Sequence, residues 1–92
     1  MTEKQVAVLV RHNQAEALRV AGGMTLTDHA VDVYVLDEPL ADTPAVEEQM
    51  EVLEFADVEP ISAVPGQEGP GGSVSPAALA ERLPGYDAVL AL

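Results

Sequence analysis

The five consecutive apolar residues from Val6 to Val10 constrain the fold more than any other stretch of this chain. Such a run is typical of a strand buried on both faces, and strands of this kind lie centrally in parallel sheets that helices cover. The polar tripeptide Arg11-His12-Asn13 follows directly. Because open α/β sheets hold their ligands at the carboxyl ends of their strands, this tripeptide marks the place where we expect a site.

Helix-like and strand-like segments alternate after this first strand. Asn13 is a candidate helix cap, and the helix it begins is expected to end between Gly22 and His29. The apolar face of that helix consists of Ala17, Val20, Ala21 and Met24. Residues 30–36 alternate and predict a second strand, in which Asp32 and Tyr34 favour a position near an edge of the sheet.

Two further helices have start signals in which a hydroxyl side chain precedes proline, at Thr43-Pro44 and Ser75-Pro76. Their apolar stripes are Val46, Met50 and Leu53 in the first, and Leu79 and Leu83 in the second. Residues 61–64, starting as early as residue 58, predict a short third strand, and residues 88–92 predict a fourth. We therefore expect one domain over residues 1–92, a three-layer α/β/α fold with a mostly parallel four-stranded sheet.

Glycine is concentrated in two places. Gly22-Gly23 lies within the first predicted helix, where each glycine costs about 1 kcal/mol relative to alanine, so we expect the helix to approach a strand closely there. A phosphate-binding glycine turn would instead precede the helix. Residues 66–73 hold four glycines and one proline and predict a flexible loop over Gly66–Val74.

Sixteen acidic residues against four basic ones give the chain a net charge of −12. This charge repels nucleic acid and anionic membranes, and no basic cluster reverses it locally, so we expect neither as a partner. The acidity is interpreted as a solvated surface or, more specifically, as a face that docks a basic partner. No apolar run approaches the ~20 residues that cross a bilayer, and no signal-peptide pattern begins the chain, so we expect a cytoplasmic protein.

The residue types also restrict the chemistry. The chain has no cysteine, which removes disulfides, thiolate metal sites and cysteine nucleophiles. His12 and His29 lie at opposite ends of the first predicted helix, so we expect no metal site. With neither a Gly-x-Ser-x-Gly elbow nor a dinucleotide or Walker pattern, we expect no catalytic residue and no cofactor. An enzyme that uses His12 as a general base is the weakest hypothesis, because no nucleophile or orienting acid accompanies it.

The remaining candidate is a ligand site that combines Arg11, His12 and Asn13 with Pro65 and Gly66, if both loops lie at the same sheet edge. Arg11 and the amides at the start of the first helix would bind an anion there. The structural alternative is that His12 and Asn13 only end the strand and cap the helix, and capping alone accounts for Asn13.

The segment from Gln14 to Leu36, with its Ala17-Leu18-Arg19 helix core and its Val-x-Val strand, resembles the DsrE/DsrF-like family of small α/β proteins, and the likeness continues in order to the closing strand. The resemblance implies a flavodoxin-like, DsrE-like fold, sulfur relay on a cysteine near the third strand, and assembly into trimers, hexamers or mixed complexes. At the matching residues 61–66 this chain has no thiol. No family active residue is therefore carried over, because a persulfide carrier needs a deprotonatable sulfur.

Two hypotheses about function follow. The first is a cytoplasmic, non-catalytic DsrE-like protein that forms a homo-oligomer, or pairs with a sulfur-metabolism protein, through its sheet edge or its helix faces. A small core with few aromatic residues is consistent with such association. The second is a small-molecule or anion-binding module that uses the loop after the first strand.

Overall fold

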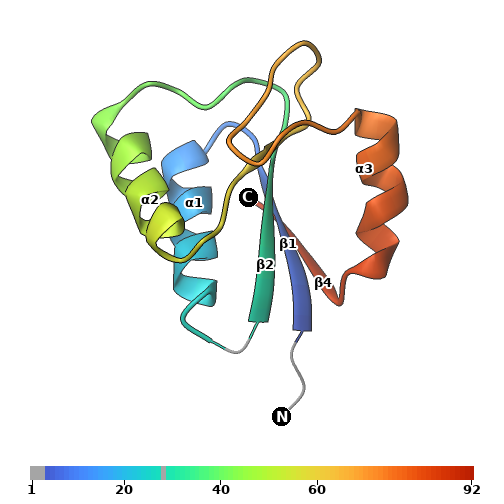
Figure 1. Ribbon diagram of the computed structural model, residues 1–92, viewed down its shortest axis with the longest axis horizontal. Helices are drawn as coiled ribbons and strands as arrows, with labels where there is room; N and C mark the ends of the chain where they lie inside the picture. Colours follow the sequence, from blue (N-terminus) through green and yellow to red (C-terminus); the bar gives the residue numbers. More distant parts are fainter. Residues whose placement is uncertain (1–3, 28) are drawn as a thin grey trace.

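The computed structural model describes residues 4–27 and 29–92. In chain order its elements are β1 (Lys4–Val10), α1 (Gln14–Met24), β2 (His29–Val35), α2 (Pro44–Phe55), β3 (Ile61–Ser62), α3 (Pro76–Arg82), a 3-10 turn (Leu83–Gly85) and β4 (Ala88–Ala91). The four strands form one parallel sheet in the order β3-β2-β1-β4. Helices α1 and α2 cover one face and α3 covers the other (Figure 1). The predicted three-layer fold with a parallel four-stranded sheet is confirmed, whereas the strand order differs from the flavodoxin-like order, in which β1 lies between β2 and β3.

Strand β1 lies at the centre of the sheet, as its unbroken apolar sequence predicts. It pairs with β2 along its whole length and with β4 from Val6 to Leu9. Val6, Val8 and Val10 pack into the cluster beneath α1 and α2, whereas Ala7 and Leu9 pack into the cluster beneath α3. Both faces of β1 are therefore buried, and no position in the run 6–10 is available to a polar side chain.

The prediction that β2 lies near an edge is confirmed, because β2 is the second strand of the sheet, with β1 on one side and the edge strand β3 on the other. The polar residues of β2 also have a local explanation. Strand β3 is only two residues long, shorter than predicted, and it pairs with Tyr34 and Val35 alone. Asp32 precedes this pairing and is exposed. The amino-terminal half of β2 thus faces solvent on one side although the strand is interior.

The helix start signals differ in outcome. The Thr43 hydroxyl accepts a hydrogen bond from Val46 N–H at 3.3 Å, and the Ser75 hydroxyl accepts one from Ala78 N–H at 3.1 Å, so both predicted caps are confirmed. Asn13 occupies the capping position of α1, but its side chain makes no capping hydrogen bond to the described first turn. The predicted place of Asn13 at the start of the helix is confirmed, but no side-chain cap accounts for the asparagine there.

Helix α1 ends at Met24, within the predicted interval, and packs against α2. Its buried face includes Leu18, whereas the predicted Val20 is only half-buried. A Cβ placed on Gly22 would lie 3.1 Å from Val52 Cγ1. The close approach at this glycine is therefore to α2 and not to a strand, which corrects the prediction. Gly22 makes the helix less stable by about 1 kcal/mol than alanine would, but it lets the two helices pack more closely.

The glycine-rich segment 66–74 lies along the outer edge of β3. Ser62 N–H donates to Gly72 O at 3.0 Å, and Val74 N–H donates to Ser62 O at 2.8 Å. A Cβ on Gly69 would lie 2.7 Å from Pro60 O, so the segment can approach this backbone only without a side chain there. Its glycines thus allow the chain to cover an edge of its own sheet. The flexibility of this loop stays a prediction.

Within the described residues, no helix combines the length and apolar character that a bilayer span requires.

Candidate functional site

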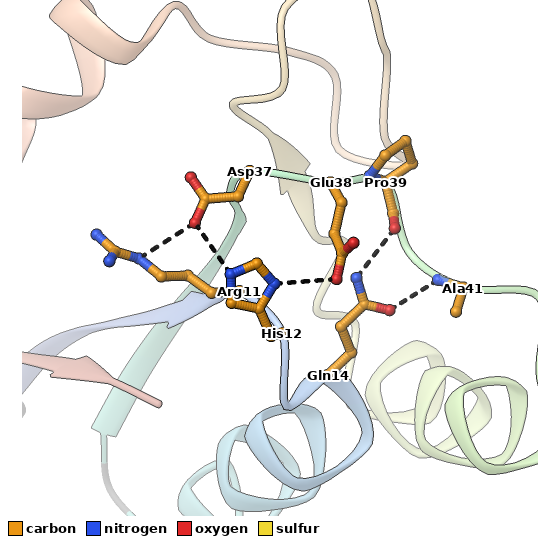
Figure 2. A network of polar contacts seen from close by, with 7 residues as sticks. All are labelled: Arg11, His12, Gln14, Asp37, Glu38, Pro39 and Ala41. Carbon is orange, nitrogen blue, oxygen red and sulfur yellow. Dashed lines mark hydrogen bonds and ion pairs between the residues drawn. The ribbon is translucent and has the colours of Figure 1, made fainter.

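The polar tripeptide after β1 lies at the carboxyl edge of the sheet, next to the loop that follows β2 (Figure 1). Arg11 Nε is 3.8 Å from Asp37 Oδ2, and His12 Nε2 is 3.9 Å from the same oxygen. His12 Nδ1 lies 3.2 Å from Glu38 Oε1. Figure 2 shows these contacts. The cation predicted to bind an anion is thus already paired with a carboxylate of this chain.

The turn after β2 brings those two carboxylates over the tripeptide. Asp37 has a φ of 68°, in the left-handed region that aspartate tolerates better than most residues. Glu38 N–H donates to Leu36 O at 2.7 Å, which closes the turn. The side chains involved are about half exposed or more, so these ion pairs contribute little to stability.

Gln14 is the buried member of this cluster, with only 6% of its surface exposed. Its amide nitrogen donates to Pro39 O at 2.9 Å, and its amide oxygen accepts from Ala41 N–H at 2.7 Å. One side chain in the first turn of α1 therefore holds the β2–α2 loop at two points (Figure 2). Sequence reasoning missed Gln14, although a signal exists: it precedes Ala17 by three residues and Leu18 by four, on the buried face of the helix.

The other predicted site residues, Pro65 and Gly66, are exposed on the loop after β3. Arg11 and Pro65 line one cleft of about 500 Å³ beneath α3, whose other lining residues are mainly apolar. Gly66 lines a neighbouring hollow with Pro65, and neither His12 nor Asn13 lines either space. The structure therefore places Arg11 and Pro65 in one cleft, which His12, Asn13 and Gly66 do not line.

A second polar chain crosses the face covered by α3. The hydroxyls of Tyr34 and Tyr86 lie 2.6 Å apart, and the Tyr86 hydroxyl donates to Asp32 Oδ2 at 2.6 Å. Burial raises the pKa of Tyr86, and the hydrogen bonds to Asp32 and Tyr34 raise it further. Tyr86 therefore stays protonated and donates a hydrogen bond. Because it holds its proton, it is a poor candidate for a general base.

The histidines do not approach each other, since His12 follows the carboxyl end of β1 and His29 begins β2 at the opposite edge of the sheet. Over residues 4–27 and 29–92, no group of three or more histidine, aspartate or glutamate side chains is arranged to hold a metal ion.

An exposed apolar surface lies away from this edge, on the outer side of the two packed helices. We call it the α1–α2 groove: a hollow of about 870 Å³ along residues 19–26 and 48–56. Phe55 is 95% exposed, Leu26 88% and Val52 47%. Sequence reasoning missed this surface, but Phe55 and Val52 both fall outside the Val46, Met50 and Leu53 stripe, which is a visible signal.

The groove is flanked by negative charge. Glu48 and Glu51 line it, and α2 contains no basic residue. Arg19 also lines the groove, but its Nε donates to Glu16 at 2.9 Å, which lowers the pKa of the Glu16 carboxyl. The apolar floor of the groove is thus bordered by carboxylates whose charge is only partly compensated.

Comparison with protein-family models, with curated proteins and with solved structures found no match. Function is therefore inferred from the geometry of the carboxyl edge and of the α1–α2 groove.

Proposed function

We propose that this chain is a non-catalytic, DsrE-like protein of the cytoplasm that works as the partner-binding subunit of a sulfur-handling assembly. The observation that carries the proposal is the exposed apolar surface of the α1–α2 groove, with Phe55 at 95% exposure. The resemblance over residues 14–36 suggests the class of partner, and the groove suggests where that partner binds.

The energetics of the groove support a binding role. Soluble monomers seldom expose large apolar patches, and those they expose are often functional. Phe55 contributes almost no burial to the fold, yet transferring such a side chain from water to an apolar contact is worth about 2 kcal/mol. Leu26 and Val52 enlarge the same surface. Burial of these side chains by a partner would release this free energy, which folding of the chain alone does not.

The role is that of a binding subunit because none of the 92 residues is a cysteine. A persulfide needs a thiol, so any sulfur relayed in the assembly stays on the partner. This chain would position that partner through contacts alone.

The test is binding of purified persulfide-carrying proteins from the same organism, measured by biolayer interferometry. We expect one of them to bind wild-type protein and to bind Phe55→Ser at least about tenfold more weakly, because an apolar anchor is lost. Arg11→Ala serves as the control at the carboxyl edge and should bind as wild type does. The proposal fails if none of these proteins binds, or if Phe55→Ser leaves binding unchanged.

A second candidate function is recognition of a small molecule or anion in the cleft beneath α3. The cleft of about 500 Å³ supports it, because Leu9, Ala63 and Leu79 provide an apolar floor and Arg11 provides a cation at its margin. The exposed Arg11–Asp37 pair is weak enough to exchange for a ligand carboxylate, phosphate or sulfur oxyanion. Calorimetry with phosphate, thiosulfate and nucleotides tests this function, and binding that Arg11→Ala does not weaken would exclude the site.

A further inference from the structure

We infer that the α1–α2 groove binds a basic amphipathic helix of the partner, an inference that rests on the proposed partner-binding function of the same surface. Three features of the groove indicate this occupant. One of its glycines leaves open space that the fold does not use, its length is about two helical turns, and its border is acidic.

Gly23 is the glycine that the fold leaves unexplained. Its neighbour Gly22 is required by the approach of Val52, but a Cβ on Gly23 would have no described atom outside its own helix within 4 Å. Gly23 lies in the helical region, is exposed, and lines the groove. It therefore needs neither the space nor the backbone freedom of glycine for folding. A glycine in such a position suits close approach by a backbone from outside the chain.

The dimensions of the groove suit a helix. Along α2 it extends over residues 48–56, which is ~12 Å at 1.5 Å per residue. Apolar anchors at i, i+4 and i+7 of a partner helix span ~10.5 Å, so two turns of that helix fill the groove. Phe55, Val52 and Leu26 would contact these anchors, as in other cases where an amphipathic helix lies in an apolar groove.

The charges flanking the groove select a basic helix. Glu48 and Glu51 line it, and Glu47 and Glu54 lie on the same helix. The guanidinium of Arg19 is engaged by Glu16 and offers little to an acidic partner. Lysine or arginine side chains beside the anchors would meet these carboxylates, whereas acidic side chains would be repelled.

A second copy of this chain is a poorer occupant. Facing grooves would bring the glutamates of two α2 helices together, in molecules that each carry a net charge of −12. Like charges that face each other across an interface oppose association.

The experiment uses fluorescein-labelled helical peptides of about 18 residues, long enough to be helical in part by themselves. Each has leucines at i, i+4 and i+7, and the remaining positions are mostly lysine, glutamine or glutamate in the three versions. Fluorescence anisotropy with wild-type protein should rank them lysine, glutamine, glutamate, with at least about a tenfold difference between the first and the last. The double variant Glu48→Gln/Glu51→Gln should reduce the advantage of lysine over glutamine. The control Glu68→Gln/Glu81→Gln makes the same change in net charge outside the groove and should leave that advantage unchanged.

Gly23 variants separate binding from folding. Gly23→Ala and Gly23→Leu should melt at or above the wild-type temperature, because either residue favours the helix and meets open space. Both should bind the lysine peptide more weakly, and Gly23→Leu should bind at least about tenfold more weakly because its side chain enters the groove. A variant that melts normally and binds normally would overturn the close approach at Gly23.

The outcomes distinguish this inference from the proposed function. If the three peptides bind equally, or if none binds while a persulfide-carrying protein still depends on Phe55, the basic helix is excluded and the binding function stands. If neither peptides nor proteins bind, both fail. If wild-type protein alone sediments as a dimer that Phe55→Ser converts to a monomer, the occupant is a second copy and the inference is overturned.

Discussion

The carboxyl edge of the sheet and the α1–α2 groove differ in where their side chains find partners. At the carboxyl edge, Gln14 is buried with both ends of its amide bonded to the β2–α2 loop, and Arg11 faces Asp37. In the groove, Phe55 and Leu26 extend from the ends of packed helices into solvent. The polar side chains of the carboxyl edge have their partners within the chain, whereas the apolar side chains of the groove are left in contact with solvent.

The two regions therefore differ in what they offer to another molecule. Charged residues after a central strand drew attention to the carboxyl edge, but their contacts there are internal. The groove contains no conspicuous motif, yet it is the surface whose burial would still release free energy.

The strongest test compares two residues of α2. Leu53 is fully buried, and Leu53→Ala should lower the free energy of unfolding by about 3 kcal/mol, through lost burial and the cavity that remains. Phe55→Ser should change it by no more than about 0.5 kcal/mol, because Phe55 is almost fully exposed. Urea denaturation measures both. A Phe55→Ser cost as large as that of Leu53→Ala would show that Phe55 belongs to the core.

Gln14→Ala tests the carboxyl edge. The substitution leaves Ala41 N–H and Pro39 O without their amide partner in a part-buried place, and should cost about 2 kcal/mol. Asn13→Ala is the matched control next to it and should cost no more than about 0.5 kcal/mol, since its side chain makes no capping bond to the described first turn. Equal costs at the two positions would mean that Gln14 does not fix the loop.

On the α3 face, the Tyr86 hydroxyl also has hydrogen-bond partners within the chain, and its raised pKa predicts that stability depends on pH. The folded protein raises the pKa of Tyr86, whereas the unfolded chain loses this proton near pH 10. The stabilising contribution of the neutral hydroxyl is therefore complete below about pH 10 and is lost as the pH rises above it.

Melting temperatures measured from about pH 8 to 11 should fall less steeply for Tyr86→Phe than for wild type. At neutral pH the same variant should be less stable by about 1 kcal/mol, because the hydroxyl of the buried Tyr34 loses its partner. Identical alkaline slopes would contradict the assignment.

The smallest effect is expected for the ion pair that the sequence made most conspicuous. A double-mutant cycle with Arg11→Ala and Asp37→Asn should give a coupling below about 0.5 kcal/mol, and less at high salt, because both groups are half exposed. Asparagine is chosen because it tolerates the positive φ of Asp37. A coupling above about 1 kcal/mol would place this pair among the contacts that hold the fold.

Local signals predicted the fold well. The apolar run from Val6 predicted a central strand, and Thr43-Pro44 and Ser75-Pro76 predicted two helix starts, because these patterns depend on backbone geometry and near neighbours. Predictions that depended on distant residues did less well. Gly22 packs against α2 and not a strand, and β3 is two residues long where residues 61–64 were predicted.

The candidate site divides in the same way. The sequence placed Arg11 and Pro65 near one edge of a parallel sheet, since strand direction alone brings those loops to the same side. It did not reveal that Asp37 would turn back onto Arg11, because that contact depends on a single left-handed residue. It also did not reveal Gln14 or Phe55 as important, because their roles depend on what lies opposite each side chain.

Residue type and short-range periodicity are enough to predict the alternation of strands and helices, the central place of β1 and the absence of any thiol. Which side chains meet depends on the three-dimensional fold. It directed the charges of the carboxyl edge toward one another and left Phe55 outside the packed helices, since the pairing of surfaces depends on how elements distant in sequence are oriented.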